Sequence, residues 1–117
     1  MKNSEVKRLI LEGRLPPKSK FVGYIVTKLI SDEFLGSIQD KGDSYIWGWM
    51  RLPHKAIRFK TEDAAKKMAE EYGKDAIVEG LLETNKQFIV LSEFSDEEKD
   101  RIRKEMAEFA QNHKGGS

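Results

Sequence analysis

The sequence predicts a single α+β domain in which an antiparallel sheet packs against two to three helices. Two kinds of segment carry this prediction. Some are short runs of β-branched and aromatic residues bounded by turn residues, and others repeat apolar residues at helical spacing. The chain has 117 residues, which is the size of one domain. We expect residues 1–114 to form this domain and residues 115–117, Gly-Gly-Ser, to be a flexible tail.

The sheet is expected to contain a three-stranded meander. Its most apolar strand is predicted over residues 21–30, and this strand should be central because both of its faces carry apolar side chains. Residues 34–39 and 44–50 should complete the meander around a turn at residues 40–43. Gly42 can supply the positive φ that such a turn needs.

A second hairpin is predicted later in the chain. Its strands should span residues 76–84 and 87–94 and meet at a turn formed by Asn85 and Lys86. Between the meander and this hairpin, residues 56–59 should form a short extended piece. The sheet is therefore expected to consist of the meander plus this hairpin.

Three helices are predicted from their capping residues and apolar spacing. The clearest begins after Thr61, whose hydroxyl can cap it, and ends at Gly73. Ser95 and Glu98 have the spacing of a capping box, which predicts a highly charged final helix. The predicted helices span residues 4–12, with Ser4 as N-cap, residues 62–72, and residues 96–112, with Ile102, Met106 and Phe109 as the apolar positions of the last.

The composition excludes several classes of function. With 21 basic and 20 acidic residues the net charge is +1, which is too balanced for a general nucleic-acid coat or for a DNA mimic. The chain has no cysteine, and its two histidines have no neighbour at metal-ligand spacing. No nucleophile elbow or phosphate loop occurs. We therefore expect no enzymatic activity, no metal and no cofactor.

The expected cellular location follows from the lack of a membrane-spanning or signal-peptide pattern. No segment reaches the roughly 20 apolar residues of a membrane span, and the N-terminal apolar run is too short for a signal peptide. The absence of cysteine also suits a reducing compartment. We expect a soluble protein in the cytoplasm of the host cell.

The strand over residues 44–50 is the most informative segment for function. Its aromatic residues alternate, so they project from one face, while Ile46, Gly48 and Met50 point the other way. Basic residues follow within about ten positions. Aromatic and basic residues together are typical of protein interfaces and of nucleic-acid surfaces. The predicted partner-binding residues are Tyr45, Trp47, Trp49, Arg51, Lys55 and Arg58.

Two interpretations of this strand remain open. In one, the aromatic side chains pack under a helix as core, and their truncation would unfold the protein. In the other, Ile46, Gly48 and Met50 form the buried side and the aromatic ladder is an exposed binding surface. Gly48 between two tryptophans indicates a bulge or a close approach by another backbone.

The segment 53–64, Pro-His-Lys-Ala-Ile-Arg-Phe-Lys-Thr-Glu-Asp-Ala, resembles a phrase found in small proteins of phages and prophages. These proteins carry a β-meander that ends in a Tyr/Trp-rich strand, then Lys-Ala-x-Arg-Phe-Lys-Thr and a short helix. The resemblance covers about residues 21–72. It implies an accessory protein of a mobile element and assigns no activity.

Three functions are consistent with these observations. The first is a non-enzymatic accessory protein that binds a host protein or nucleoprotein complex, as a stoichiometric inhibitor of a defence complex such as a CRISPR effector. The second is a small nucleic-acid-binding module that uses the aromatic and basic strand. The third is a structural or assembly protein that acts as a homodimer.

Overall fold

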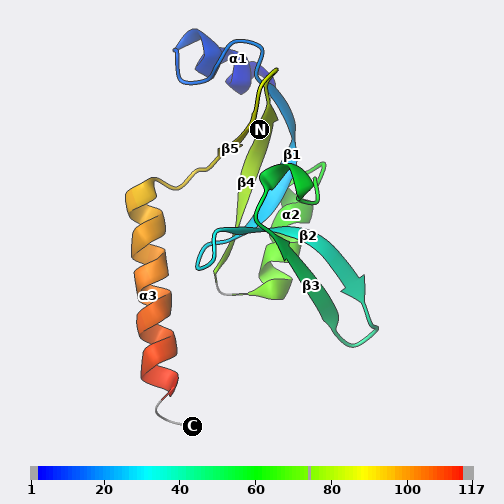
Figure 1. Cartoon of the computed structure of the whole chain (residues 1–117), viewed down its shortest axis with the longest axis vertical. Helices are drawn as coiled ribbons and strands as arrows, with labels where there is room; N and C mark the ends of the chain where they lie inside the picture. The colour runs from blue at the N-terminus through cyan, green and yellow to red at the C-terminus, as the bar shows by residue number, and fades with distance from the viewer. Residues whose placement is uncertain (1–2, 74, 115–117) are drawn as a thin grey trace.

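A five-stranded antiparallel sheet, in the order β3-β2-β1-β4-β5, carries three helices (Figure 1). The computed structural model describes residues 3–73 and 75–114, so the expected tail lies outside the described residues. The predicted α+β class is confirmed. The elements are α1 (Asn3–Leu11), β1 (Lys20–Lys28), β2 (Glu33–Asp40), β3 (Tyr45–Met50), the 3₁₀ helix η1 (Pro53–Lys55), α2 (Glu62–Tyr72), β4 (Ala76–Glu83), β5 (Phe88–Leu91) and α3 (Asp96–Lys114).

Strand β1 is the centre of the sheet, as its apolar faces predict. Ile25 and Val26 are adjacent, point to opposite faces and are both fully buried. Strand β4 pairs with β1 along its whole length, from Lys20 opposite Glu83 to Lys28 opposite Ala76. The meander and the second hairpin therefore belong to one sheet. The β1 strand ends two residues earlier than predicted, because residues 29–32 form the turn to β2.

Strand β2 leaves β1 soon after the turn. Their register contains only two pairs, Thr27 with Phe34 and Lys28 with Glu33. Further along β1 the place of β2 is taken by Phe59, whose backbone exchanges hydrogen bonds of 2.8 and 2.9 Å with Tyr24. The Ile57 N–H donates to the Leu35 carbonyl at 2.9 Å. The extended piece predicted over residues 56–59 is thus a wedge between two diverging strands.

Helix α2 covers one face of the sheet, called the α2 face below. The Thr61 hydroxyl accepts a hydrogen bond from the Ala64 N–H, and Gly73 ends the helix with a φ of 109°. Ala65 is fully buried against Val26 and Leu35. Small residues on the buried stripe bring the helix close to the strands. Both boundaries and both caps agree with the sequence prediction.

The first helix packs on the same face, further along the sheet. Val6 and Leu9 of α1 are buried with Leu82 of β4, which shares a face with Val78 by alternation. Ser4 lies inside this helix, because α1 already includes Asn3, so the prediction of Ser4 as N-cap is wrong. Gly13 follows the helix with a φ of 74°, as a residue that closes a helix often does.

The opposite face, called the outer face, is covered by η1 and the residue after it. Ala56 is buried there with Ile25 and Leu81, and Phe88 packs against them. Strand β5 is shorter than the predicted 87–94. It ends at Leu91 because the chain bends at Glu93 and Phe94, where the Phe94 N–H donates a hydrogen bond to the Ser92 hydroxyl, and then continues to α3.

Helix α3 is tied to the sheet by side chains. Lys99 forms an ion pair of 2.7 Å with Glu79, whose side chain is only 1% exposed. Arg103 donates to the Leu29 carbonyl at 2.8 Å and pairs with Asp32. The Glu98 N–H donates to the Ser95 hydroxyl, so the predicted N-cap is confirmed. Ile102 and Met106 are half-buried, and the side chain of Phe109 lies outside the described residues.

Candidate interaction surfaces

The three aromatic residues of β3 share one face of the sheet, as their alternation predicts, and that face is the one under α2. Trp49 lies edge-to-face against Tyr72 of α2 with ring centroids 4.7 Å apart. The ring centroid of Trp47 lies 5.4 Å from that of Tyr72. The ring of Tyr45 in turn contacts Trp47, with a centroid distance of 5.4 Å. Both tryptophans are half-buried. They extend the core cluster around Leu35.

A lysine side chain packs against this aromatic cluster near the C-terminal end of α2. The Lys28 ammonium lies 5.5 Å from the Trp49 ring centroid and 5.4 Å from that of Tyr72. Its hydrogen bond with Tyr72 raises the pKa of Lys28 above the ordinary value, although burial acts in the opposite direction. A ring already covered by a cation and by Tyr72 has little free surface for stacking a base.

The basic residues that follow β3 lie elsewhere. Arg58 is placed over the ring of Phe88, 5.5 Å from its centroid, and this ring belongs to the outer face. His54 stacks on the same ring at 5.6 Å. Arg51 and Lys55 are exposed on the connection that passes over the outer face. The six residues predicted to bind a partner are therefore divided between two faces, and their role stays a prediction.

The outer face of the β2–β3 hairpin is apolar and exposed. Ile46, Met50 and Leu52 are 52%, 37% and 50% exposed, and with Tyr45 they make four of the six large exposed hydrophobic residues found among those described. We call Ile46, Met50 and Leu52, with the adjacent Arg51 and Lys55, the outer hairpin surface. It joins apolar and basic side chains, which is typical of a protein interface.

Two glycines shape this surface by leaving room for side chains of the neighbouring strand. A Cβ on Gly36 would overlap Cγ of Met50, and one on Gly48 would overlap the Ser37 hydroxyl oxygen. The register shifts between Leu35 and Ser37, so the bulge lies on β2. At Gly48 the close approach comes from the Ser37 side chain and not from another backbone as predicted, and the bulge lies on the opposite strand.

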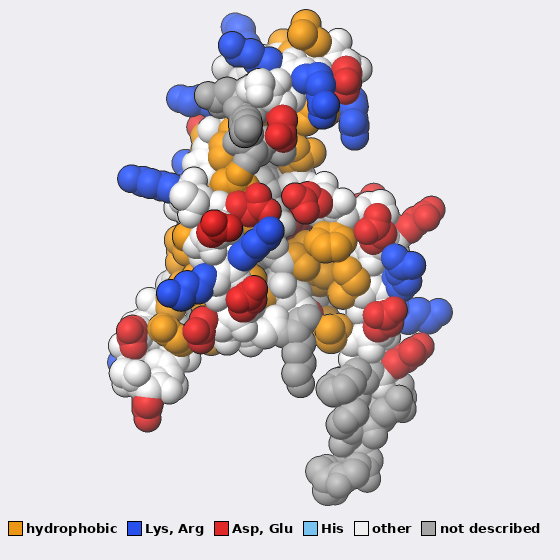
Figure 2. Space-filling model, turned by 180° about the vertical axis from the view of Figure 1, so that it is seen from behind, with side chains coloured by type: hydrophobic (Ala, Val, Ile, Leu, Met, Phe, Trp, Pro, Cys, Tyr) orange, Lys and Arg blue, Asp and Glu red, His pale blue; other side chains and the backbone are white. Residues whose placement is uncertain are grey.

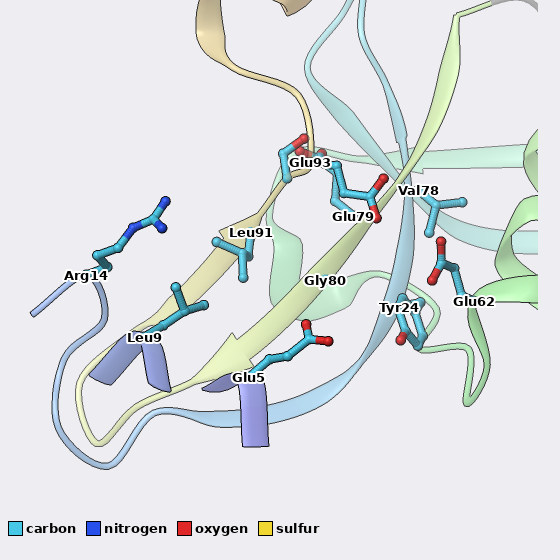
Figure 3. Close-up of a pocket in the computed structure, with 11 residues that line it drawn as sticks. Glu5, Leu9, Arg14, Tyr24, Glu62, Val78, Glu79, Gly80, Leu91 and Glu93 are labelled. Carbon is cyan, nitrogen blue, oxygen red and sulfur yellow. The ribbon is translucent and has the colours of Figure 1, made fainter. Parts of the chain in front are cut away.

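A groove opens on the α2 face between α1 and α2 (Figure 3). Its volume is about 310 Å³, and apolar side chains of Leu9, Tyr24, Val78 and Leu91 form its floor. Four glutamates from four segments and Arg14 surround it. Glu62 is paired with Lys66 at 2.8 Å and Glu79 with Lys99, whereas Glu5 and Glu93 are exposed and make no ion pair with the described residues.

A second hollow lies next to this groove, at the N-terminal end of β4. Its volume is about 560 Å³, it shares Glu62, Val78 and Glu93 with the first, and it adds Ala69, Ala76 and Phe94 among its apolar lining residues. Seen from behind, acidic side chains crowd the middle of the molecule beside an exposed hydrophobic area (Figure 2). Sequence reasoning missed this groove, because its residues come from segments that only the fold brings together.

The carboxylates around the groove do not converge on a point. Among the side chains that the structure describes, in residues 4–73 and 75–108, no three of His, Asp or Glu are placed to hold one metal ion. None of the helices in that part of the chain has the length and apolar character to cross a membrane. No protein-family model, no curated protein and no solved structure matches this sequence.

Proposed function

We propose that this protein works by binding another protein, and that the outer hairpin surface is the part that docks. The supporting observation is that three exposed apolar side chains, those of Ile46, Met50 and Leu52, lie within one seven-residue stretch, residues 46–52. Exposed apolar surface costs solubility, so contiguous patches of it commonly mark interaction sites. The basic residues Arg51 and Lys55 lie beside it and form a charged rim.

The position of the aromatic residues favours a protein partner over a nucleic acid. A base-stacking surface needs free ring faces, and Trp47 and Trp49 are engaged with Tyr72. The apolar residues that are free, Ile46, Met50 and Leu52, have no aromatic ring. Aliphatic side chains of this kind fit a hydrophobic pocket on a protein.

The specific form of this proposal is an inhibitor of a host defence complex. The resemblance to phage proteins implies an accessory protein of a mobile element, and inhibition of host defence is the role proposed for it. A stoichiometric inhibitor needs a stable fold and one docking surface, and it needs no catalytic group. Capture of the partner identifies the target.

The test is affinity capture from host lysate with three forms of the tagged protein. The wild type is compared with Ile46→Asp/Met50→Asp and with Leu11→Asp, a control at an apolar residue of α1 that is 88% exposed. We expect wild type and Leu11→Asp to retain the same partner and the double variant to lose it. Nuclease treatment should leave the capture unchanged.

Three results separate the alternatives. Capture that nuclease abolishes and that weakens steeply with salt indicates a nucleic-acid module. A partner that proves to be a defence complex, inhibited at one protein per complex, supports the specific form. Retention of the partner by the double variant contradicts the proposed surface.

A further inference from the structure

The groove on the α2 face makes a second interaction site, separate from the outer hairpin surface. It lies on the opposite side of the sheet, between α1 and α2, and consists of two neighbouring hollows that share Glu62, Val78 and Glu93 in their linings. We infer that this groove receives an extended segment of a partner protein in which basic side chains alternate with apolar ones.

The apolar part of the inference follows from the floor of the groove. Leu9, Leu91 and Val78 line the first hollow, and Ala76 and Phe94 line the second. Phe94 belongs to none of the three core clusters of the described residues, although it is half-buried. A large ring that serves no core is available for contact with a ligand.

The basic part of the inference follows from the charges on the rim. Besides the buried Glu79, which is paired with Lys99, four glutamates line the two hollows, at positions 5, 62, 70 and 93, against Arg14 and Lys66. Lys66 is already paired with Glu62. Glu5 and Glu93 face solvent without an ion pair to the described residues, so a cationic side chain gains a partner on either side of the groove.

The extended conformation follows from the edge of β4. Strand β5 pairs with β4 only from Gly80 to Glu83, whereas β4 begins at Ala76. In the described part of the chain, residues 76–79 of β4 pair with β1 on one side and with no strand on the other. α3 reaches this part of β4 through the ion pair of Lys99 with Glu79. This ion pair joins side chains only, and the backbone of residues 76–79 has no strand partner among the described residues on that side, so an added segment can hydrogen-bond to it.

The test uses fluorescent nine-residue peptides that alternate lysine with valine, glutamate with valine, or lysine with glycine. Anisotropy gives the Kd of each, and backbone amide shifts of the ¹⁵N-labelled protein locate the site. We expect only the lysine–valine peptide to bind well, with shifts at Val78, Leu91 and Glu93. Glu5→Lys/Glu93→Lys should weaken it about tenfold, and Phe94→Ala several-fold.

A matched control keeps the charge change and moves it away from the groove. Glu71→Lys/Glu108→Lys alters two exposed carboxylates that do not line it, and the Kd should stay within about twofold. Circular dichroism checks that all variants fold. The inference is overturned if no peptide binds at millimolar concentration, if the glutamate–valine peptide binds equally well, if the control weakens binding as much, or if the shifts fall on Ile46 and Met50.

Discussion

The second and third helices begin in the same way and are attached to the sheet in different ways. Each has a hydroxyl N-cap followed by acidic residues in its first turn. Helix α2 lies on the strands through Ala65 and Ala69, and the aromatic cluster fills the space at its end. Helix α3 is attached by two long side chains, since Lys99 forms an ion pair with Glu79 and Arg103 donates to the Leu29 carbonyl. Figure 1 shows α3 standing beside the sheet.

This difference shows that helix formation and helix docking depend on different residues. The caps and charges along α3 suffice to form it, but its half-buried apolar residues are few, Ile102 and Met106 among those described. Its attachment therefore rests on ion pairs and one hydrogen bond to a carbonyl. We expect α2 to unfold together with the sheet and α3 to be able to separate from it.

The largest expected effect concerns the aromatic cluster beneath α2. Trp49→Ala should lower the free energy of unfolding by about 3 kcal/mol, because it removes the ring that packs on Tyr72 and leaves a cavity beside Leu35. Ile46→Ala, on the exposed side of the same strand, should cost under about 1 kcal/mol. Urea denaturation measures both. Equal losses would mean that the two faces of β3 are equally buried.

An intermediate effect is expected at the ion pair that holds α3. Lys99→Met leaves the carboxylate of Glu79 buried without a partner, and stability should fall by about 2 kcal/mol. The double variant Glu79→Leu/Lys99→Met removes the charge as well and should regain most of the loss. Denaturation of the single and double variants gives the coupling energy. If Lys99→Met is neutral, the ion pair does not hold the helix.

The smallest effect compares the two N-caps directly. Thr61→Ala and Ser95→Ala each remove one capping hydrogen bond, worth about 1 kcal/mol to its helix. Thr61→Ala should move the global urea midpoint, since α2 unfolds with the core. Ser95→Ala should chiefly reduce helical circular dichroism and amide protection in α3. A global shift of the same size in both variants would show that α3 unfolds together with the sheet.

The sequence predicted local features well, because local residues determine them. Thr61, Gly73 and Ser95 mark helix ends through their own hydrogen bonds or backbone angles, and all three act as predicted. The alternation of Tyr45, Trp47 and Trp49 predicted that they share a face. The alternation could not predict which face of the strand a helix covers, because that depends on the face of the sheet against which α2 packs.

Features that join distant segments were not predictable in this way. Glu5, Glu62 and Glu93 read individually as solvated residues, and only the packing of α1, α2 and β5 around one groove brings them together. The wedge of residues 57–59 between β1 and β2 was likewise missed. An extended segment can be recognised from its residues, but its pairing partner, Tyr24, is chosen by the bulged path of β2.

The pairing of β1 with β4 has a consequence for the order in which a ribosome completes this fold. Strands β1, β2 and β3 and helix α2 have all been synthesised when Gly73 is added. At that moment one edge of β1 has no neighbour, because β4 begins only at Ala76. A nascent or truncated chain ending there presents an unpaired apolar strand, which is a template for aggregation. By pairing with β1, residues 76–83 cover this edge and remove the template for aggregation.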